Sequence, residues 1–488
     1  MAALTIEMGQ KTIQVDLDVP KSLKTILEEL QIQQPHPCGG RGTCGKCAVV
    51  LEGAVSQPNE AEQKAGMRLS CQAVILGDAK VILQQREDLA QIQTHSLANA
   101  QLGVPMAGGV GAAVDIGTTT IALKRYDLQT GALIGESAME NPQVQVAADV
   151  MGRIGAAMDG QLDKLQKQVL DAISQLLVQA GGTVDTMVIT GNTTMLYLLT
   201  GRDPACLSCV PFEADTRFDT QTHILDIQTY LPACMNAFVG ADITCAVLAS
   251  EMCEKKTALL CDVGTNGEIA LWKDGILYVT STAAGPAFEG AGISCGCSSI
   301  PGAIDRVWSE NGKLQVHTIG EAPAVGLCGS GLIDAVAQLL ELEWMDETGA
   351  LDEDEVELAP NVVLQQKDIR AMQLAKAAIA AGIQTLLEVS DTTCDQIETL
   401  YIAGGFGSHL NIESAVKIGL IPEELEEKVQ VIGNAALAGT AQLLLDCRKL
   451  EAIRSIAAKA KHWNLGGNPK FNENYMNAML FPMDDMEW

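Results

Sequence analysis

The chain has 488 residues, about three times the length of a typical domain, so we expect several folding units with a sizeable core. Its 61 acidic residues outnumber its 32 basic ones, and the formal charge of -29 argues against nucleic acid or an anionic membrane surface as a partner. We find neither a run of 18 apolar residues that could span a bilayer nor a signal peptide, and therefore expect a cytoplasmic protein.

Residues 1–90 are predicted to form a small unit rich in strands. The predicted strands cover 4–7, 12–16, 73–76 and 81–83, and the predicted helix covers 23–30. A glycine-rich loop follows the helix. The stretch 91–111 is polar and then rich in Ala and Gly, which is typical of a linker, so we place a domain boundary there.

An internal repeat organises the rest of the chain, where strands alternate with long helical patterns as in an α/β fold. A hairpin is predicted at 114–123 and again at 261–271, with one residue inserted in the second copy. A strand-to-helix turn is predicted at 188–193 and again at 401–407. This order indicates a duplicated domain with a cleft between its halves. We place the halves at 112–255 and 256–488, the second including a C-terminal return.

Four cysteines of the first unit have a spacing that suits a metal centre. Cys38, Cys44 and Cys47 follow the pattern C-x5-C-x2-C within the glycine-rich loop, and Cys71 comes later. Four thiolates can enclose two irons, and a loop of glycines can aim backbone N–H groups at the sulfur atoms. Fifteen cysteines in a chain without an export signal favour reduced thiols over disulfides. A structural zinc site is the alternative.

The segment 37–47, together with 69–72, resembles the [2Fe-2S] loop of ferredoxins, with the cysteine spacing of the adrenodoxin type. The resemblance covers the whole first unit. It implies a β-grasp [2Fe-2S] domain whose cluster is held by all four cysteines. It also implies that this domain is an electron inlet for the part of the chain that follows.

The two predicted hairpins carry matching residues at their turns. Each strand ends in a carboxylate, Asp115 in the first copy and Asp262 in the second, and a glycine and side-chain donors follow. The candidate phosphate-binding residues are Gly117, Thr118 and Thr119 in the first hairpin and Gly264, Thr265 and Asn266 in the second. Two such hairpins can grip a polyphosphate from both sides, with Asp115 and Asp262 holding Mg²⁺ and one of them orienting or deprotonating the attacking water. The alternative is a pair of turns in which Asp only caps the loop.

Glycines at the second strand-to-helix turn suit a nucleobase, since they allow close approach. The candidate residues are Gly404, Gly405 and Phe406. In order with the two hairpins, they make the region from about 112 to about 460 similar to the ATPase domain shared by actin, Hsp70 chaperones and sugar kinases. The resemblance implies a duplicated, ribonuclease H-like α/β fold that binds ATP.

The combination of both domains, with the motifs at 140–143, 191–195, 284–290 and 328–331, resembles the reductive activators of corrinoid proteins. This resemblance implies ATP-dependent passage of one electron from the [2Fe-2S] cluster to a corrinoid protein of a methyltransferase system, which returns inactive Co(II) to Co(I). It also implies a low-potential electron donor and a homodimer. The last cysteine is Cys447, so the C-terminal [4Fe-4S] motif of some relatives is missing and the 2Fe cluster is the only redox centre expected.

Other functions fit the same pattern less well. An ATP-driven electron donor for a radical dehydratase or an aryl-CoA reductase would need cysteines within the ATPase domain, and the close pairs 206/209 and 295/297 do not match that arrangement. A small-molecule kinase would need an acceptor site and a base, for which we find no candidates. A filament protein of actin type would show nucleotide-dependent assembly without turnover.

Overall fold

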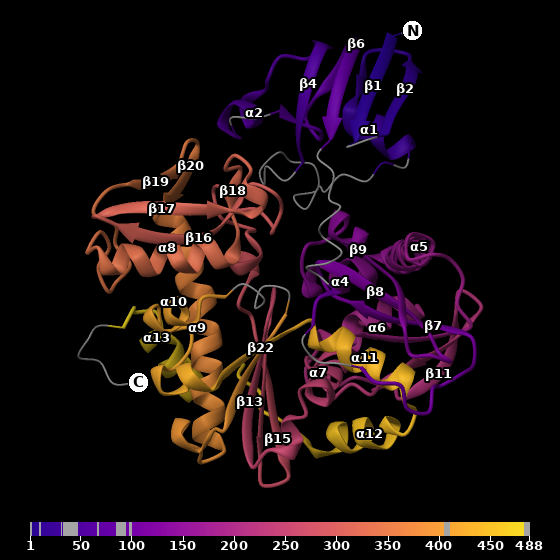
Figure 1. Ribbon diagram of the computed structural model, residues 1–488, viewed down its shortest axis with the longest axis vertical. Coiled ribbons are helices and arrows are strands. Elements are labelled where there is room, and N and C mark those ends of the chain that lie inside the picture. The colour runs from indigo at the N-terminus through magenta and orange to yellow at the C-terminus, as the bar shows by residue number, and fades with distance from the viewer. Residues whose placement is uncertain are drawn as a thin grey trace. The chain divides into compact units, whose positions relative to one another are not determined.

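The computed structural model describes residues 2–8, 11–30, 32, 47–65, 68–83, 94–96, 100–404 and 410–482. The chain divides into two compact units. The first contains Met1–Asp88 with Pro142–Ala156, and the second contains Leu89–Asn141 with Ala157–Trp488. Figure 1 shows the helices and strands of both, labelled where there is room.

The first unit contains a six-stranded sheet in the order β2-β1-β6-β4-β5, with β3 paired to β6. Its strands are β1 (Ala2–Met8), β2 (Lys11–Leu17), β3 (Lys21–Ser22), β4 (Ala48–Val55), β5 (Arg68–Leu69) and β6 (Val74–Leu83), and its helices are α1 (Leu23–Glu29), α2 (Glu60–Ala65) and α4 (Val150–Ala156). Strand β1 runs parallel to β6 and antiparallel to β2. Helix α1 buries Leu23, Ile26 and Leu27, which share one helical face, in the core of this sheet.

The predictions of strands at 4–7 and 12–16 and of a helix at 23–30 are confirmed by β1, β2 and α1. The prediction of separate strands at 73–76 and 81–83 is wrong, because β6 is continuous. Ile75, Ala79 and Val81 alternate toward the core through the polar middle of the strand. There the carboxylate of Asp78 accepts a hydrogen bond from the Ala3 backbone N–H at 2.8 Å.

The second unit contains two six-stranded sheets that match in five of their six strands, as the repeat predicts, and the sixth strand lies at opposite edges of the two sheets. The first sheet has the order β11-β12-β10-β7-β8-β9, with β7 (Val110–Ile116), β8 (Thr120–Asp127), β9 (Leu133–Glu140), β10 (Thr186–Gly191), β11 (Thr220–Ile224) and β12 (Ile227–Leu231). The second has the order β22-β21-β13-β14-β15-β23, with β13 (Thr257–Val263), β14 (Gly267–Lys273), β15 (Ile276–Thr282), β21 (Thr399–Ala403), β22 (Val429–Gly433) and β23 (Ala460–His462). In each sheet an antiparallel meander is extended by a parallel strand, β10 beside β7 and β21 beside β13.

Helices fill the space between and around these sheets. They are α5 (Leu162–Gln179), α6 (Thr193–Thr200), α7 (Ala241–Ser250), α8 (Gly329–Glu341), α9 (Gln366–Val389), α10 (Ile412–Lys417), α11 (Ala435–Leu445), α12 (Lys449–Lys459) and α13 (Pro469–Asn477). Helices α11 and α12, from the C-terminal return, lie against α7 (Figure 1). The described helices include none that is both long and apolar enough to cross a membrane.

The strand period of two divides the core of the second unit in two. Leu259 and Cys261 of β13 point into a cluster with α8 and α9, whereas Ala258 and Leu260 point into a cluster with α7 and α11. Residues of β7 and β8 also belong to the second cluster, so both sheets share it. This sharing brings the ends of β7 and β13 to a common site.

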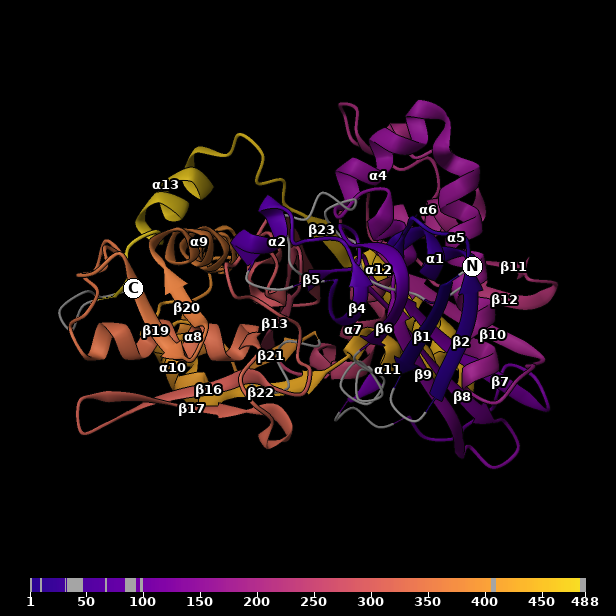
Figure 2. The ribbon, with the colours of Figure 1, turned by 90° about the horizontal axis from the view of Figure 1, so that it is seen from above.

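A smaller sheet and a hairpin are inserted after β15. They consist of β16 (Ala303–Glu310), β17 (Lys313–Thr318) and β18 (Gly326–Leu327), and of β19 (Glu355–Ala359) with β20 (Val362–Gln365). Strand β16 packs along α8 (Figure 2).

The described part of the predicted linker packs on the second unit. The backbone N–H groups of Gly103 and Met106 donate to the carbonyl oxygens of Leu445 and Leu444, and the Cys447 N–H donates to the Val104 carbonyl oxygen. The stretch therefore lies along the C-terminal end of α11, although its polar and small residues are typical of a flexible linker.

Candidate nucleotide and cluster sites

The predicted phosphate loops are the tight turns of the β7–β8 and β13–β14 hairpins. The Gly117 N–H donates to the Thr120 carbonyl oxygen at 2.9 Å, and the Gly264 N–H donates to the Asn266 carbonyl oxygen at 3.0 Å. A Cβ atom at Gly117 would lie 2.7 Å from the Thr120 carbonyl oxygen. The first turn therefore needs glycine to stay this tight.

The tips of both hairpins meet at one carboxylate. The hydroxyl oxygens of Thr119 and Thr265 lie 3.3 Å apart, and both hydroxyls donate to Oε2 of Glu289, at 3.0 and 2.9 Å. Glu289 ends the short 3-10 helix η5 (Pro286–Glu289). Its Oε1 lies 3.8 Å from the position that a Cβ atom would take at Gly264. The repeat thus brings its two threonines together in one site.

Two predicted carboxylates and a third that the sequence did not reveal lie near these turns. Asp115 and Asp262 are the next-to-last residues of β7 and β13, and Asp242 lies in the first turn of α7. Burial and the nearby Asp242 charge raise the pKa of Asp115 and of Asp262 to about 7. Burial raises the pKa of Asp242 to about 6. Asp115 Oδ2 also accepts a hydrogen bond from Asn434 Nδ2 at 3.0 Å.

Glu268 is a fourth carboxylate that sequence reasoning missed. It lies directly opposite Asp262 in the β13–β14 ladder. Burial, together with the charges of Asp242 and Asp262, raises its pKa well above the ordinary value. Within the described chain, no three His, Cys, Asp or Glu side chains are grouped closely enough to hold a metal ion directly. A cation here would therefore contact these carboxylates partly through water.

Two asparagine side chains brace the first turn, between β7 and β8. Asn192 donates to the Thr118 hydroxyl at 3.1 Å and caps α6 by accepting from the Met195 N–H at 2.9 Å. Asn141 donates to the Gly117 carbonyl oxygen at 2.8 Å. Asn141 and Asn192 belong to the motifs at 140–143 and 191–195, which are recognisable in the sequence, but the sequence does not indicate that they contact the phosphate loops.

Of the predicted nucleobase residues, Gly404 is described, and it lies against the acidic site. Its φ is +96°, and a Cβ atom there would lie 2.8 Å from Asp262 Oδ1 and 2.7 Å from the Val263 carbonyl oxygen. Only glycine fits this position without a shift. Gly405 and Phe406 lie outside the described residues.

Two of the four predicted cluster ligands are described, and they lie side by side in the first unit. The sulfur atoms of Cys47 and Cys71 are 3.2 Å apart, and both are free thiols. The Ser70 N–H donates to the Cys47 carbonyl oxygen at 2.8 Å, which joins the two segments. Burial raises the pKa of Cys47 to about 12, so a thiolate there needs a bound cation. This pair fits a thiolate-ligated cluster; Cys38 and Cys44 lie outside the described residues.

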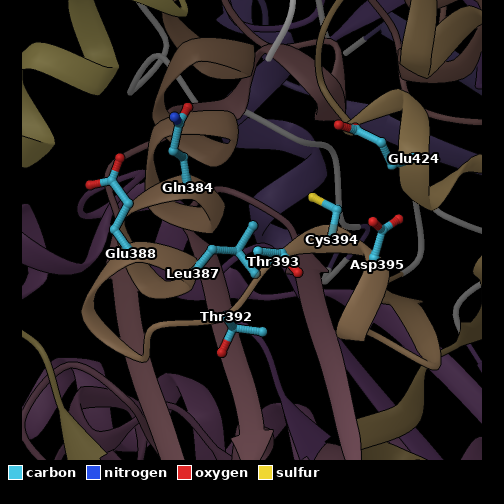
Figure 3. Close-up of a pocket in the computed structure, with 8 residues that line it drawn as sticks. All are labelled: Gln384, Leu387, Glu388, Thr392, Thr393, Cys394, Asp395 and Glu424. Atoms are coloured by element: carbon cyan, nitrogen blue, oxygen red, sulfur yellow. The ribbon is translucent and has the colours of Figure 1, made fainter.

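A pocket of about 280 Å³ lies at the C-terminal end of α9 (Figure 3). It is lined by Gln384, Leu387, Glu388, Thr392, Thr393, Cys394, Asp395 and Glu424. None of these residues belongs to the two hairpins. Its three carboxylates make it unsuited to an anionic nucleotide.

Family models match nearly the whole chain. Residues 6–76 match the 2Fe-2S iron-sulfur cluster binding domain, residues 110–255 match the RACo middle region, and residues 256–488 match the C-terminal domain of RACo, the ASKHA domain. The resemblance of the first unit to ferredoxins and of the second to actin-like ATPases is confirmed by these matches.

Two curated relatives and one solved structure resemble the chain along most of its length. The corrinoid activation enzyme RamQ of Eubacterium limosum is 33% identical, with 76% of this chain and 70% of RamQ covered. The [Co(II) methylated amine-specific corrinoid protein] reductase of Methanosarcina barkeri is 26% identical, with 76% and 77% covered. The structure of a reductive activator for a corrinoid iron-sulfur protein is 26% identical, covers 99% of both chains and superposes with a TM-score of 0.72.

Proposed function

From the premise that this chain belongs to the reductive activators of corrinoid proteins, we propose that it uses ATP to reduce the corrinoid protein of a methyltransferase system from Co(II) to Co(I). The observation that carries this proposal is that one chain contains a 2Fe-2S domain together with a RACo middle region and an ASKHA domain, each of which contributes one of the two hairpins whose tips meet. It is an enzyme that couples ATP hydrolysis in the ASKHA domain to the transfer of one electron.

The need for ATP follows from the energetics of the electron transfer. We expect the Co(II)/Co(I) couple to lie below the potential of a ferredoxin-type cluster, which is about −400 mV in plant-type proteins. Each gap of about 59 mV costs a factor of ten, or about 1.4 kcal/mol. Binding the corrinoid protein differently in the ATP and ADP states can supply such an amount.

The two hairpins supply the phosphate contacts in this proposal. The backbone at Gly117 and Gly264 approaches the phosphates closely, and Thr118, Thr119 and Thr265 donate hydrogen bonds to them. Asn266 adds a further donor at the second turn. Gly404, Gly405 and Phe406 border the adenosine.

The carboxylates supply the Mg²⁺ contacts. We assign Asp115 and Asp262 to hold the ion through oxygen or through bridging water, and one of them to orient the attacking water. Burial raises the pKa of both groups, and the charge of Asp242 raises it further. A bound cation would relieve this repulsion between carboxylates, which supports the assignment.

The first unit holds the redox group. We assign Cys38, Cys44, Cys47 and Cys71 as the ligands of the [2Fe-2S] cluster, which when bound takes one electron from a low-potential donor and gives one electron to cobalt. The Ser70 N–H bonded to the Cys47 carbonyl oxygen keeps the ligand segments together. We place this domain at 1–90, the linker at 91–111 and the ATPase halves at 112–255 and 256–488. We also propose that the protein is a homodimer and that it acts in the cytoplasm.

The experiment that tests this function is an anaerobic optical assay. The reduced protein is mixed with a Co(II) corrinoid protein, with and without Mg-ATP, and the formation of Co(I) is followed. We expect ATP-dependent Co(I) formation, abolished in Cys71→Ser and lowered at least about a hundredfold in Asp262→Asn.

Matched controls are Cys209→Ser, at an exposed cysteine, and Asp274→Asn, at the exposed β14–β15 turn. Both should retain the wild-type rate. If cognate corrinoid proteins gave no Co(I) while the cluster was intact and ATP was hydrolysed, the proposal would be overturned in favour of an electron donor to another enzyme.

A further inference from the structure

Glu289 accepts hydrogen bonds from one threonine of each hairpin. It joins the tips of the two repeated hairpins, whose threonine hydroxyls also touch each other directly. The motif 284–290 that contains it is recognisable in the sequence, but the sequence suggests no role for this carboxylate.

A hydroxyl group has a single proton and therefore donates one hydrogen bond at a time. Thr119 and Thr265 both donate to Oε2 of Glu289, at 3.0 and 2.9 Å. While they do so, neither can donate to a phosphate. A carboxylate and a phosphate are also both anions, and they repel each other at contact distance. Glu289 and a terminal phosphate therefore compete for the same two hydroxyl groups.

We propose that Glu289 holds the two hairpins together in the place of the terminal phosphate of ATP, and that ATP displaces it on binding. The inference rests on the proposed ATP site and adds a regulator to it. Because Glu289 competes with the terminal phosphate for the hydroxyls of Thr119 and Thr265, it lowers the affinity for ATP. Its helix η5 separates from the hairpins only when that phosphate is bound.

A displacement of Glu289 would also move the loop that follows η5. The Gly290 and Ala291 N–H groups donate back to Ala287 and Pro286, so the loop that follows is attached to η5. A Cβ atom at Gly290 would lie 2.3 Å from the Cys297 carbonyl oxygen, which shows how tightly this loop is folded. Its other end pairs with β18, since the Leu327 N–H donates to the Cys295 carbonyl oxygen. Moving Glu289 therefore strains the loop 290–297.

The test compares the wild-type protein with Glu289→Gln, which keeps the shape of the side chain and removes its charge. Binding of a non-hydrolysable ATP analogue and of ADP is measured by calorimetry in the presence of Mg²⁺. A charged hydrogen-bond acceptor is stronger than a neutral one, so we expect the Kd for the analogue to fall about fivefold to tenfold and the Kd for ADP to change less. Glu310→Gln, at an exposed residue of β16, makes the same charge change and should leave both Kd values unaltered.

Hydrogen exchange gives a second readout, because a purely structural role of Glu289 would not make amide exchange respond to the ATP analogue. We expect the ATP analogue to speed amide exchange in 286–297 in the wild-type protein, and Glu289→Gln to show this faster exchange without nucleotide. Weaker or unchanged binding of the analogue by Glu289→Gln would overturn the inference, as would a lower turnover number at unchanged affinity, which would indicate that Glu289 orients the water. If neither wild type nor variant bound any nucleotide, the proposed ATP site itself would be wrong.

Discussion

Asp115, Asp242, Asp262 and Glu268 lie near one another, and burial raises the pKa of each. In the unfolded chain such carboxyl groups titrate near pH 4. Between about pH 4 and pH 7 the native protein therefore binds more protons than the unfolded chain does. The stability that these groups contribute is fully present below pH 4 and is lost as the pH rises, through about 6 for Asp242 and through about 7 for Asp115 and Asp262.

The variant Asp262→Asn tests this linkage. Since the pKa of Asp262 moves from 3.8 to about 7, we expect the variant to be more stable than wild type at pH 8, by on the order of 2 to 4 kcal/mol. At pH 4 the gain should nearly vanish. Thermal unfolding at both pH values, without nucleotide, measures it, with Asp274→Asn as the control. An equal gain at both pH values would contradict the argument.

The residues of the nucleotide site differ in how readily the sequence reveals them. Asp115 and Asp262 stand out because they occur twice in one pattern. Asp242 has no counterpart in the repeat, and its only sequence signal is the glycine at 240, just before an apolar helical run. Glu268 and Glu289 come close to the predicted residues only through strand pairing and tertiary folding.

Helices α7 and α11 meet at a very close contact between the two sheets. A Cβ atom at Gly439 of α11 would lie 2.0 Å from the carbonyl oxygen of Cys245 in α7. Ala or any larger residue at 439 would force the helices apart, and the shared core would lose contacts along their whole length.

Gly439→Ala is therefore expected to destabilise the second unit by about 2 kcal/mol or more, despite the better helix propensity of alanine. The matched control is Gly155→Ala in α4, where a Cβ atom would have no neighbour within 4 Å. That variant should be neutral or slightly stabilising. Thermal unfolding of both variants measures the difference. Equal unfolding midpoints would show that the α7–α11 contact can adjust to a larger residue at little cost.

Local patterns predict the elements of this chain better than they predict connections. The hairpins and their strand-to-helix partners follow from apolar periodicity and from the repeat. The continuity of β6 does not, because Gly77 and Asp78 resemble turn residues, and the strand continues through them because Ile75 and Ala79 on either side pair with β4. The docking of 100–107 on the end of α11 depends on backbone hydrogen bonds and on the packing of Ala100, Met106 and Ala107, which are too few and too small to form a recognisable apolar pattern.

On the scale of the whole molecule, each unit has its own hydrophobic core. The core around β1, β4 and β6 consists of residues of the first unit, and the clusters around β13, α7 and α9 consist of residues of the second. A defect at one site should therefore leave the other site folded.

We expect Cys71→Ser to lose the visible absorption of the cluster while keeping its affinity for ATP. Asp262→Asn should show the converse, with an unchanged spectrum and weaker Mg-ATP binding. Absorption spectroscopy and calorimetry on the same samples measure both properties. Loss of nucleotide binding in Cys71→Ser would show that the units depend on each other for folding.

Helix α11 carries two of the contacts described above. Asn434, its N-cap residue, donates to Asp115, and Gly439 in its middle lies against α7. Large interlocking side chains resist sliding, whereas a contact at glycine leaves a smooth surface. We therefore expect α11 to shift along α7 at Gly439 when the charge of Asp115 changes, because Asn434 at the start of the helix is hydrogen-bonded to that carboxylate.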